Sequence, residues 1–145
     1  MRSRLYAVAY KGDIKDMFLH VKAIESDRGA QRILYRGRSR DTEPEIFEIA
    51  SLMFGPTSSP CNAIYVKNAN AERFSSDYPR AAASIVNDSY IDDYLSSCKN
   101  EQEAAKIIRE VIGINASAGF EMHGWASNKT HVLPANSTPS GVACG

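Results

Sequence analysis

The sequence has no excess of charge of either sign, because its 17 lysines and arginines equal its 17 aspartates and glutamates. A uniformly basic chain is therefore excluded, and any nucleic-acid binding must use local patches or further domains. No apolar run approaches the ~20 residues that a membrane span needs. The apolar run over residues 5–10 is also shorter than a typical signal-peptide core.

Cysteines and histidines are few, with three of each. The cysteines are Cys61, Cys98 and Cys144. Their odd number and the absence of metal-ligand spacing indicate free thiols in a reducing compartment, so we expect a cytoplasmic, intracellular protein. The histidines are His20, His123 and His131. They show no ligand spacing either, and we expect them at the surface.

What is present fits a single globular domain. Of the 145 residues, 43% are hydrophobic, which is enough for a core if the elements pack together. Residues 134–145 are rich in Pro, Ser, Gly and Ala, a composition typical of a disordered tail. We therefore expect one domain over residues 1–133 and a tail over 134–145.

Short apolar runs separated by turn residues predict strands over residues 5–10, 31–36, 45–54, 90–95 and 120–122. The first run is apolar on both faces, as in a central strand. Residues 26–29 read as a turn and 37–44 as a charged loop. With the helices described next, this order favours an α+β fold with helices on one face of an antiparallel sheet. The open face would then hold acidic residues.

Capping residues mark the predicted helices. Ser59 can cap a helix that has Pro60 in its first turn and runs to about residue 74. Residues 78–87 read as helical or irregular. Asn100 can cap a further helix, with Glu103 completing a capping box and Gly119 near its end.

Apolar spacing indicates which helix faces are buried. The expected buried positions of the first helix are Ala63, Val66, Ala69 and Phe74. Those of the last helix are Ala104, Ile108, Val111 and Ile112.

Two adjacent carboxylates, Asp92 and Asp93, lie between apolar residues. An unpaired carboxylate is costly to bury, so such a pair indicates either an acidic turn facing water or a metal site. Asp13 ends the first strand and can lie beside Asp92 on a neighbouring strand. Oxygen ligands of this kind favour Mg²⁺, and two such ions serve phosphoryl or nucleotidyl transfer. Since successive strand residues point to opposite faces, both aspartates can share one site only at a tight turn over residues 91–93.

Three ordered motifs carry a family resemblance. They are Asp13-Ile14-Lys15-x-Met17-Phe18, Phe54-Gly55-x-x-x-Ser59-Pro60 and Tyr90-Ile91-Asp92-Asp93. In order and spacing they resemble motifs A, B and C of the reverse transcriptase palm. Further stretches resemble the BEL/Pao type of long-terminal-repeat retrotransposon: Asp27-Arg28-x-x-Gln31-Arg32, Tyr65-Val66-Lys67-Asn68-x-Asn70-Ala71-Glu72, Tyr78-Pro79-Arg80-Ala81-Ala82, Ala118-Gly119-Phe120-Glu121 and Trp125-Ala126-Ser127-Asn128. The likeness covers residues 5–133.

The resemblance implies an RNA-directed DNA polymerase palm, part of a larger Pol polyprotein in a retroelement particle. Its catalytic and metal-binding residues would be Asp13, Asp92 and Asp93, holding two Mg²⁺ ions, with Mn²⁺ as an alternative. Asp93 is the least firmly implied of the three.

Other roles implied by the resemblance concern the nucleotide. Phe18 would be the steric gate against a ribose 2′-hydroxyl, or else a core residue. The backbone amides of Asp16 and Met17 would face the triphosphate.

The second and third motifs also carry implied roles. Phe54 and Gly55 would lie beneath the incoming nucleotide, although Gly55 would equally serve the turn into the helix. Tyr90 would pack near the primer end or be a sheet aromatic. Lys129 lies near the region where such polymerases carry a lysine that protonates pyrophosphate, or is simply solvated.

The implied partners are an RNA or DNA template-primer, a deoxynucleoside triphosphate, and the fingers and thumb segments of the parent polyprotein. The sequence contains little of the fingers and no thumb, so we expect weak or no activity from the chain alone. It also departs from the family at Lys11-Gly12, where small or apolar residues are usual. The alternatives are a catalytically inactive remnant that binds metal or nucleic acid, and an RNA-dependent RNA polymerase palm.

Overall fold

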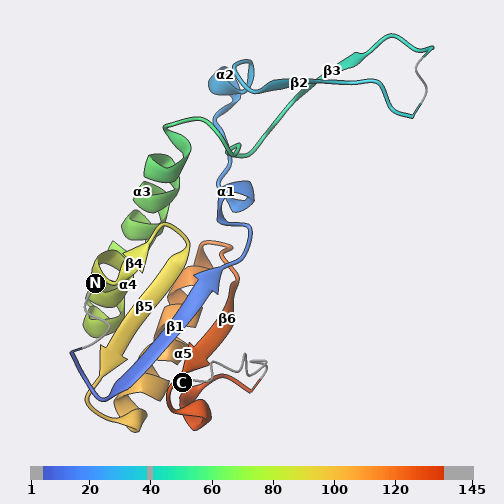
Figure 1. Cartoon of the computed structure of the whole chain (residues 1–145). Helices are drawn as coiled ribbons and strands as arrows, with labels where there is room; N and C mark the ends of the chain where they lie inside the picture. The colour runs from blue at the N-terminus through green and yellow to red at the C-terminus, as the bar shows by residue number, and fades with distance from the viewer. Residues whose placement is uncertain (1–4, 39–40, 136–145) are drawn as a thin grey trace.

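The computed structural model describes residues 5–38 and 41–135, and its main element is a four-stranded antiparallel sheet of order β4-β5-β1-β6 (Figure 1). These strands are β1 Val8–Ile14, β4 Ser89–Tyr90, β5 Asp93–Cys98 and β6 Met122–Ser127. Strand β1 pairs with β5 on one side and β6 on the other. The strand that carries Asp13 is therefore internal to the sheet.

Helices pack on the sheet, behind it in the view of Figure 1. The helices are α1 Met17–His20, α2 Glu25–Arg28, α3 Ser59–Glu72, α4 Pro79–Asn87, α5 Glu101–Ser117 and the 3₁₀ turn η1 Thr130–Val132. Helix α5 contacts β1, β5 and β6, while α4 contacts β4 and both α3 and α5. The predicted α+β class is thus confirmed. Among the described helices, none is long and apolar enough to cross a membrane.

A second, two-stranded sheet stands apart from this body. Strands β2 Arg32–Tyr35 and β3 Glu45–Glu48 form an antiparallel hairpin that projects from it (Figure 1). Every residue of both strands is exposed. The sequence pattern predicted both strands but not their separation from the main sheet.

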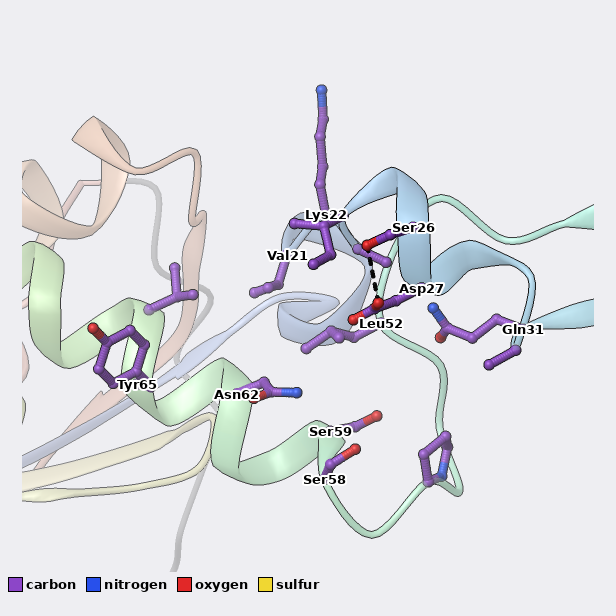
Figure 2. A pocket seen from close by; sticks show the side chains of 15 residues that line it. Val21, Lys22, Ser26, Asp27, Gln31, Leu52, Ser58, Ser59, Asn62 and Tyr65 are labelled. Atoms are coloured by element: carbon purple, nitrogen blue, oxygen red, sulfur yellow. Dashed lines mark hydrogen bonds between the residues drawn. The ribbon is translucent and has the colours of Figure 1, made fainter.

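A cavity of about 640 Å³ lies between the base of this hairpin and the start of α3 (Figure 2). Its polar lining includes Ser26, Asp27, Gln31, Ser58 and Asn62. The Ser26 hydroxyl donates to the Asp27 carboxylate at 3.0 Å. The three carboxylates of the predicted metal site are not part of its lining.

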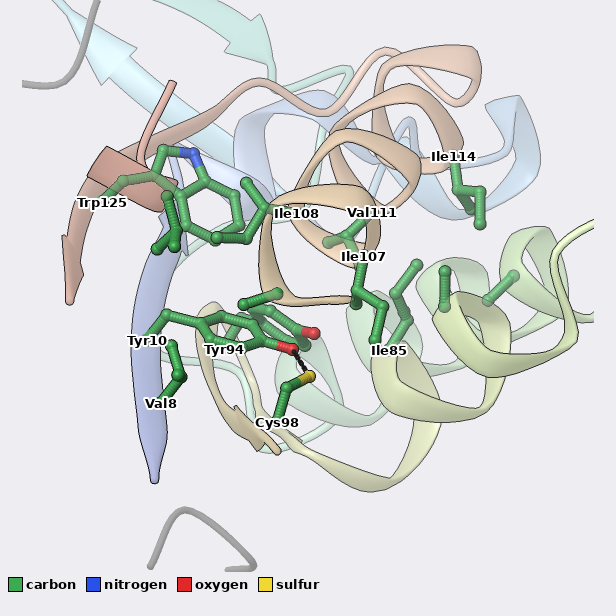
Figure 3. Close-up of a cluster of buried hydrophobic side chains, with 14 residues drawn as sticks. Val8, Tyr10, Ile85, Tyr94, Cys98, Ile107, Ile108, Val111, Ile114 and Trp125 are labelled. Carbon is green, nitrogen blue, oxygen red and sulfur yellow. Dashed lines mark hydrogen bonds between the residues drawn. The ribbon is translucent and has the colours of Figure 1, made fainter. Parts of the chain in front are cut away.

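The main core lies between the sheet and α5 (Figure 3). Alternate residues of a strand face the same side, and in β1 these are the buried Val8, Tyr10, Gly12 and Ile14. Since β1 buries one face only, the expectation of a strand covered on both faces is wrong. Lys11 and Asp13 belong to the other, open face.

Helix α5 follows its sequence pattern closely. The Asn100 side chain accepts a hydrogen bond from the Glu103 backbone N–H at 2.8 Å, which confirms the predicted cap. Three of the four expected core residues are buried and Ile112 is partly buried. The helix ends at Ser117, just before Gly119, whose φ of 79° suits glycine.

Helix α3 departs from its predicted face. Its buried residues are Ser59, Ala63, Lys67, Asn70 and Ala71. Of the four residues expected on the apolar face, Ala63 is buried and Phe74 packs against the main core, but Ala69 is only partly buried and Val66 is exposed. The hydrophobic pattern did not predict this face because the face includes polar residues whose side chains form hydrogen bonds. The Asn70 amide, for example, donates to the Ile114 carbonyl at 2.7 Å.

Several predicted boundaries also move. Strand β1 begins at Val8 rather than residue 5 and continues through Asp13, while the strand expected over 45–54 stops at Glu48. The expected turn at 26–29 is largely helix α2, and the last strand begins at Met122 rather than residue 120. Ser59 is the first residue of α3 rather than its cap, although Pro60 is in the first turn as predicted. Residues 78–87 are helical, as α4.

Two expectations concern the chain ends and the thiols. Cys61 and Cys98 are free, as predicted, with Cys98 buried beside the Tyr10 hydroxyl. Cys144 and residues 136–145 of the expected tail lie outside the described residues.

Candidate functional site

The adjacent carboxylates Asp92 and Asp93 lie at a tight hairpin turn between β4 and β5. Tyr90 pairs with Asp93, so Ile91 and Asp92 form the turn, as predicted. The Ile91 backbone has a φ of 54°, in the left-handed region that β-branched residues rarely adopt. Such a conformation persists only where the surrounding structure holds it.

Strand β1 brings Asp13 to the same end of the sheet. Asp13 is directly opposite Asp93 in the β1–β5 register. The next residue, Ile14, donates its backbone N–H to the Asp92 carbonyl at 3.0 Å. Directly opposed residues have Cβ atoms about 4.5–5.5 Å apart and share a face. The three carboxylates, distant in sequence, therefore gather at one end of the open face.

Electrostatics at Asp13 reflect this crowding. Partial burial raises the pKa of the Asp13 carboxyl above its ordinary value, and the charges of Asp92 and, more weakly, Asp93 raise it further. The neighbouring His123 lowers the same pKa. Negative charge is therefore in excess here, and a bound cation would relieve it.

His123 on β6 is part of this site, which the sequence did not indicate. Its Nε2 lies 3.1 Å from Oδ2 of Asp13. His123 is opposite Asp13 in the β1–β6 register. His123 lies at the surface as expected, with its side chain 47% exposed, but its contact with Asp13 was not predicted.

Lys67 on α3 is a second residue that sequence reasoning missed. It is only 2% exposed, and its Nζ donates to the Ile91 carbonyl at 3.4 Å. Burial lowers the pKa of Lys67 to about 8, and the negative charge of Asp92 partly opposes this. The available signal was its helical spacing from Ala63 and Ala71, which are both buried.

The aromatic residues of the predicted nucleotide site lie just beyond Asp13. Phe18 belongs to a second core cluster, which contains Ile14, Met17, Phe18, Val21, Leu52, Ala63 and Phe120. The Phe18 ring is 8% exposed and meets the ring of Phe54 edge to face, with centroids 4.9 Å apart. The structure thus brings Phe18 and Phe54 together, with Phe18 buried in the core and Phe54 67% exposed over it.

The remaining predicted residues are spread around this end. Gly55 has a φ of 110° and a Cβ there would meet nothing within 4 Å, so the turn geometry alone requires glycine. Asp16 precedes α1 in a left-handed conformation, and Met17 begins that helix with a buried side chain. Tyr90 is 65% exposed on β4, directly opposite Asp93.

Lys129 is not brought to the carboxylates. It follows the end of β6 that pairs with Tyr10, whereas Asp13 pairs near the other end. Its Nζ lies 3.6 Å from a carboxylate oxygen of Glu101, which also contacts His131.

The donor chemistry of the site fits a hard divalent cation. Carboxylate oxygens are the ligands that Mg²⁺ and Mn²⁺ prefer. Within residues 5–38 and 41–135, however, no three His, Cys, Asp or Glu side chains converge as a complete ligand set. Side-chain rotation of the half-exposed aspartates would be needed to assemble one.

No protein-family model matches the chain, and no curated protein is significantly similar to it.

Proposed function

We propose that the chain is the palm part of a BEL/Pao-like reverse transcriptase, an RNA-directed DNA polymerase that extends a primer by nucleotidyl transfer. The observation that carries the proposal is the meeting of Asp13 with Asp92 and Asp93 at one end of an open sheet face. A solvated acidic turn would need no third carboxylate from a distant strand. The raised pKa of Asp13 is consistent with a cluster of negative charges that a bound cation would stabilise.

In this proposal Asp13 and Asp92 hold the metal ions, with Asp93 beside them. Bound Mg²⁺ would lower the pKa of the primer 3′-hydroxyl and neutralise charge on the leaving pyrophosphate. The chain's own contribution is to fix the carboxylates. The paired backbones of β1 and β5 set their spacing, and the Lys67 contact to Ile91 holds the turn that carries Asp92.

The aromatic pair would shape the nucleotide pocket. Phe54, exposed above the buried Phe18, offers a flat apolar surface next to the carboxylate end of β1. Phe18 is buried in the second core cluster, so its role as the steric gate stays a prediction. The roles of Asp16, Met17, Gly55 and Tyr90 stay predictions.

Metal binding by the 145-residue chain is the first test. A metal that binds only the folded state, at about 100 times its Kd, stabilises that state by about 2.7 kcal/mol. We expect Mg²⁺ and Mn²⁺ to raise the unfolding temperature of the wild-type chain, and Asp13→Asn and Asp92→Asn to remove this effect. Asp77→Asn, an exposed aspartate in the α3–α4 loop, is the matched control and should behave as wild type.

Primer extension is the second test. Metal-dependent addition of deoxynucleotides, by the chain alone or joined to fingers and thumb segments, should be abolished by Asp92→Asn. Undiminished extension by that variant would contradict the assignment. Metal binding without extension in both settings would favour the alternative, an inactive remnant that retains a metal-binding module.

A further inference from the structure

The pairing of β6 with β1 shifts by one residue next to Asp13. Lys11 is opposite Ala126, but Asp13 is opposite His123, so Gly12 faces both Gly124 and Trp125. Two residues opposing one define a β-bulge. Gly124 has a φ of 62°, the left-handed conformation that glycine adopts without steric cost.

The bulge determines which side chain meets Asp13. If the register at Lys11 continued unchanged, Gly124 would lie opposite Asp13 and would offer it no side chain. The extra residue moves His123 into that position instead. At the same point the Trp125 ring turns into the core, where a Cβ on Gly12 would come within 3.0 Å of it. Bulges commonly re-aim side chains in this way beside functional sites.

The resulting contact pairs the imidazole of His123 with the carboxylate of Asp13. Nε2 of His123 lies 3.1 Å from Oδ2 of Asp13. An ionised carboxylate can only accept, so a hydrogen bond across this contact would be donated by the Nε2 N–H of His123. The contact engages Oδ2 of Asp13.

We propose that His123 is a positioning residue that holds the Asp13 carboxylate in the orientation needed to bind a divalent cation. The inference rests on the proposed function, because it assumes that Asp13 is a metal ligand. A carboxylate held by such a contact loses less rotational freedom when a cation binds, and partners of this kind sustain metal affinity. His123 acts through Asp13 and is not itself a ligand.

Direct titration of the 145-residue chain with Mn²⁺, followed by the electron paramagnetic resonance of the free ion, tests this. Loss of a hydrogen-bonding partner of a metal ligand typically costs about 10- to 100-fold in affinity, and we expect His123→Ala to weaken Mn²⁺ binding by that factor. His123→Gln places an amide N–H near the position of Nε2 and should restore most of the affinity. His131 contacts Glu101, so His131→Ala is the matched control and should bind Mn²⁺ as tightly as the wild type.

The outcomes separate the two proposals. If the wild-type chain binds no Mn²⁺, the proposed function fails. If the wild type binds and His123→Ala binds equally well or more tightly, only the positioning role is overturned. Equal losses in His123→Ala and His123→Gln would also overturn it, since the donor would then not be what matters. Circular dichroism and unfolding temperatures in metal-free buffer should not distinguish the variants from wild type.

Discussion

Two regions of the molecule contain similar apolar residues but differ in how far these residues are buried. One is the four-stranded sheet with its helices, and the other is the β2–β3 hairpin. In the sheet, Tyr10, Tyr94 and Val8 are almost fully buried against α5. In the hairpin, Leu34 and Ile46 are 71% and 65% exposed, and the Tyr35 ring meets the Phe47 ring across the strand pair. Burial of apolar side chains, rather than their presence, therefore separates the two regions.

This difference has a thermodynamic consequence. An isolated two-stranded hairpin is marginally stable at best, because it lacks a second layer to cover its apolar groups. The hairpin should therefore open locally at a much lower free energy than the sheet and α5. Changes in the hairpin should scarcely affect global unfolding, whereas changes in the body should affect it strongly.

The largest expected effect is on the free energy of unfolding, and two isoleucine-to-alanine substitutions, one in each region, test it. Ile108 on α5 is 1% exposed, so Ile108→Ala should lower the free energy of unfolding by about 2–5 kcal/mol. Ile46→Ala in the hairpin should change it by less than about 0.5 kcal/mol. Urea denaturation of the metal-free chain measures both. Similar losses in the two variants would mean that the hairpin is packed against something and that the contrast is false.

The sequence predicted the elements whose determinants are local. The cap at Asn100, the apolar spacing of α5 and the turn at Ile91-Asp92 depend on residues within a few positions of one another, and all were found. Strands β2 and β3 are separate from the main sheet. Whether a strand joins a sheet depends on which other elements pack against it, and a local sequence pattern does not show this. Burial of Lys67 likewise depends on a backbone carbonyl 24 residues away.

The site was predicted in part for the same reason. The carboxylate pair carries a visible signal, and register between β1 and β5 makes the meeting with Asp13 a reasonable inference. His123 meets Asp13 only because a bulge at Gly124 changes the register by one residue. Glycine has many uses in a strand, so its presence alone did not reveal the bulge.

A second prediction concerns the buried Lys67. Its pKa is about 8 in the folded chain against 10.5 ordinarily, so between these values the unfolded chain binds more protons and stability rises with pH. Each pKa unit corresponds to about 1.4 kcal/mol, which gives a rise on the order of 3 kcal/mol from this group. Lys67→Met should lack the rise. It should be more stable than wild type at pH 7, and this advantage should shrink between pH 8 and 10.5.

Lys22→Met is the control for that experiment. Lys22 lies in the segment leading to the hairpin, with an exposed side chain that points away from the cavity in Figure 2. Its replacement should leave both the stability at pH 7 and its pH dependence close to wild type. Denaturant titrations at pH 7, 8.5 and 10 compare the three proteins. A constant difference between wild type and Lys67→Met across this range would show that Lys67 is solvated, as a hairpin residue would be.

The smallest of the three effects comes from two glycines, one in each region. A Cβ on Gly12 would lie 3.0–3.1 Å from ring atoms of Trp125, which is itself 4% exposed and cannot move without disturbing the core. Gly12→Ala should therefore destabilise the chain by about 1–3 kcal/mol through overpacking. Gly37, beside the hairpin, has a φ of 69° and nothing within 4 Å of a Cβ. Asparagine tolerates that conformation, so Gly37→Asn should be nearly neutral.

The Gly12 result also bears on the carboxylates, because Gly12 precedes Asp13. The Lys11-Gly12 pair departs from the pattern of the family that the sequence resembles, and a glycine there would be expected to loosen the backbone that aims Asp13. Packing of Trp125 on Gly12 indicates instead that this backbone is held more firmly. Because Gly12 has no side chain, the Trp125 ring of β6 can pack directly against β1. Hydrogen exchange of the β1 amides distinguishes these accounts. Slow exchange at Gly12 and Asp13 in wild type, accelerated by Gly12→Ala, supports the firmly held backbone, whereas fast exchange in wild type contradicts it.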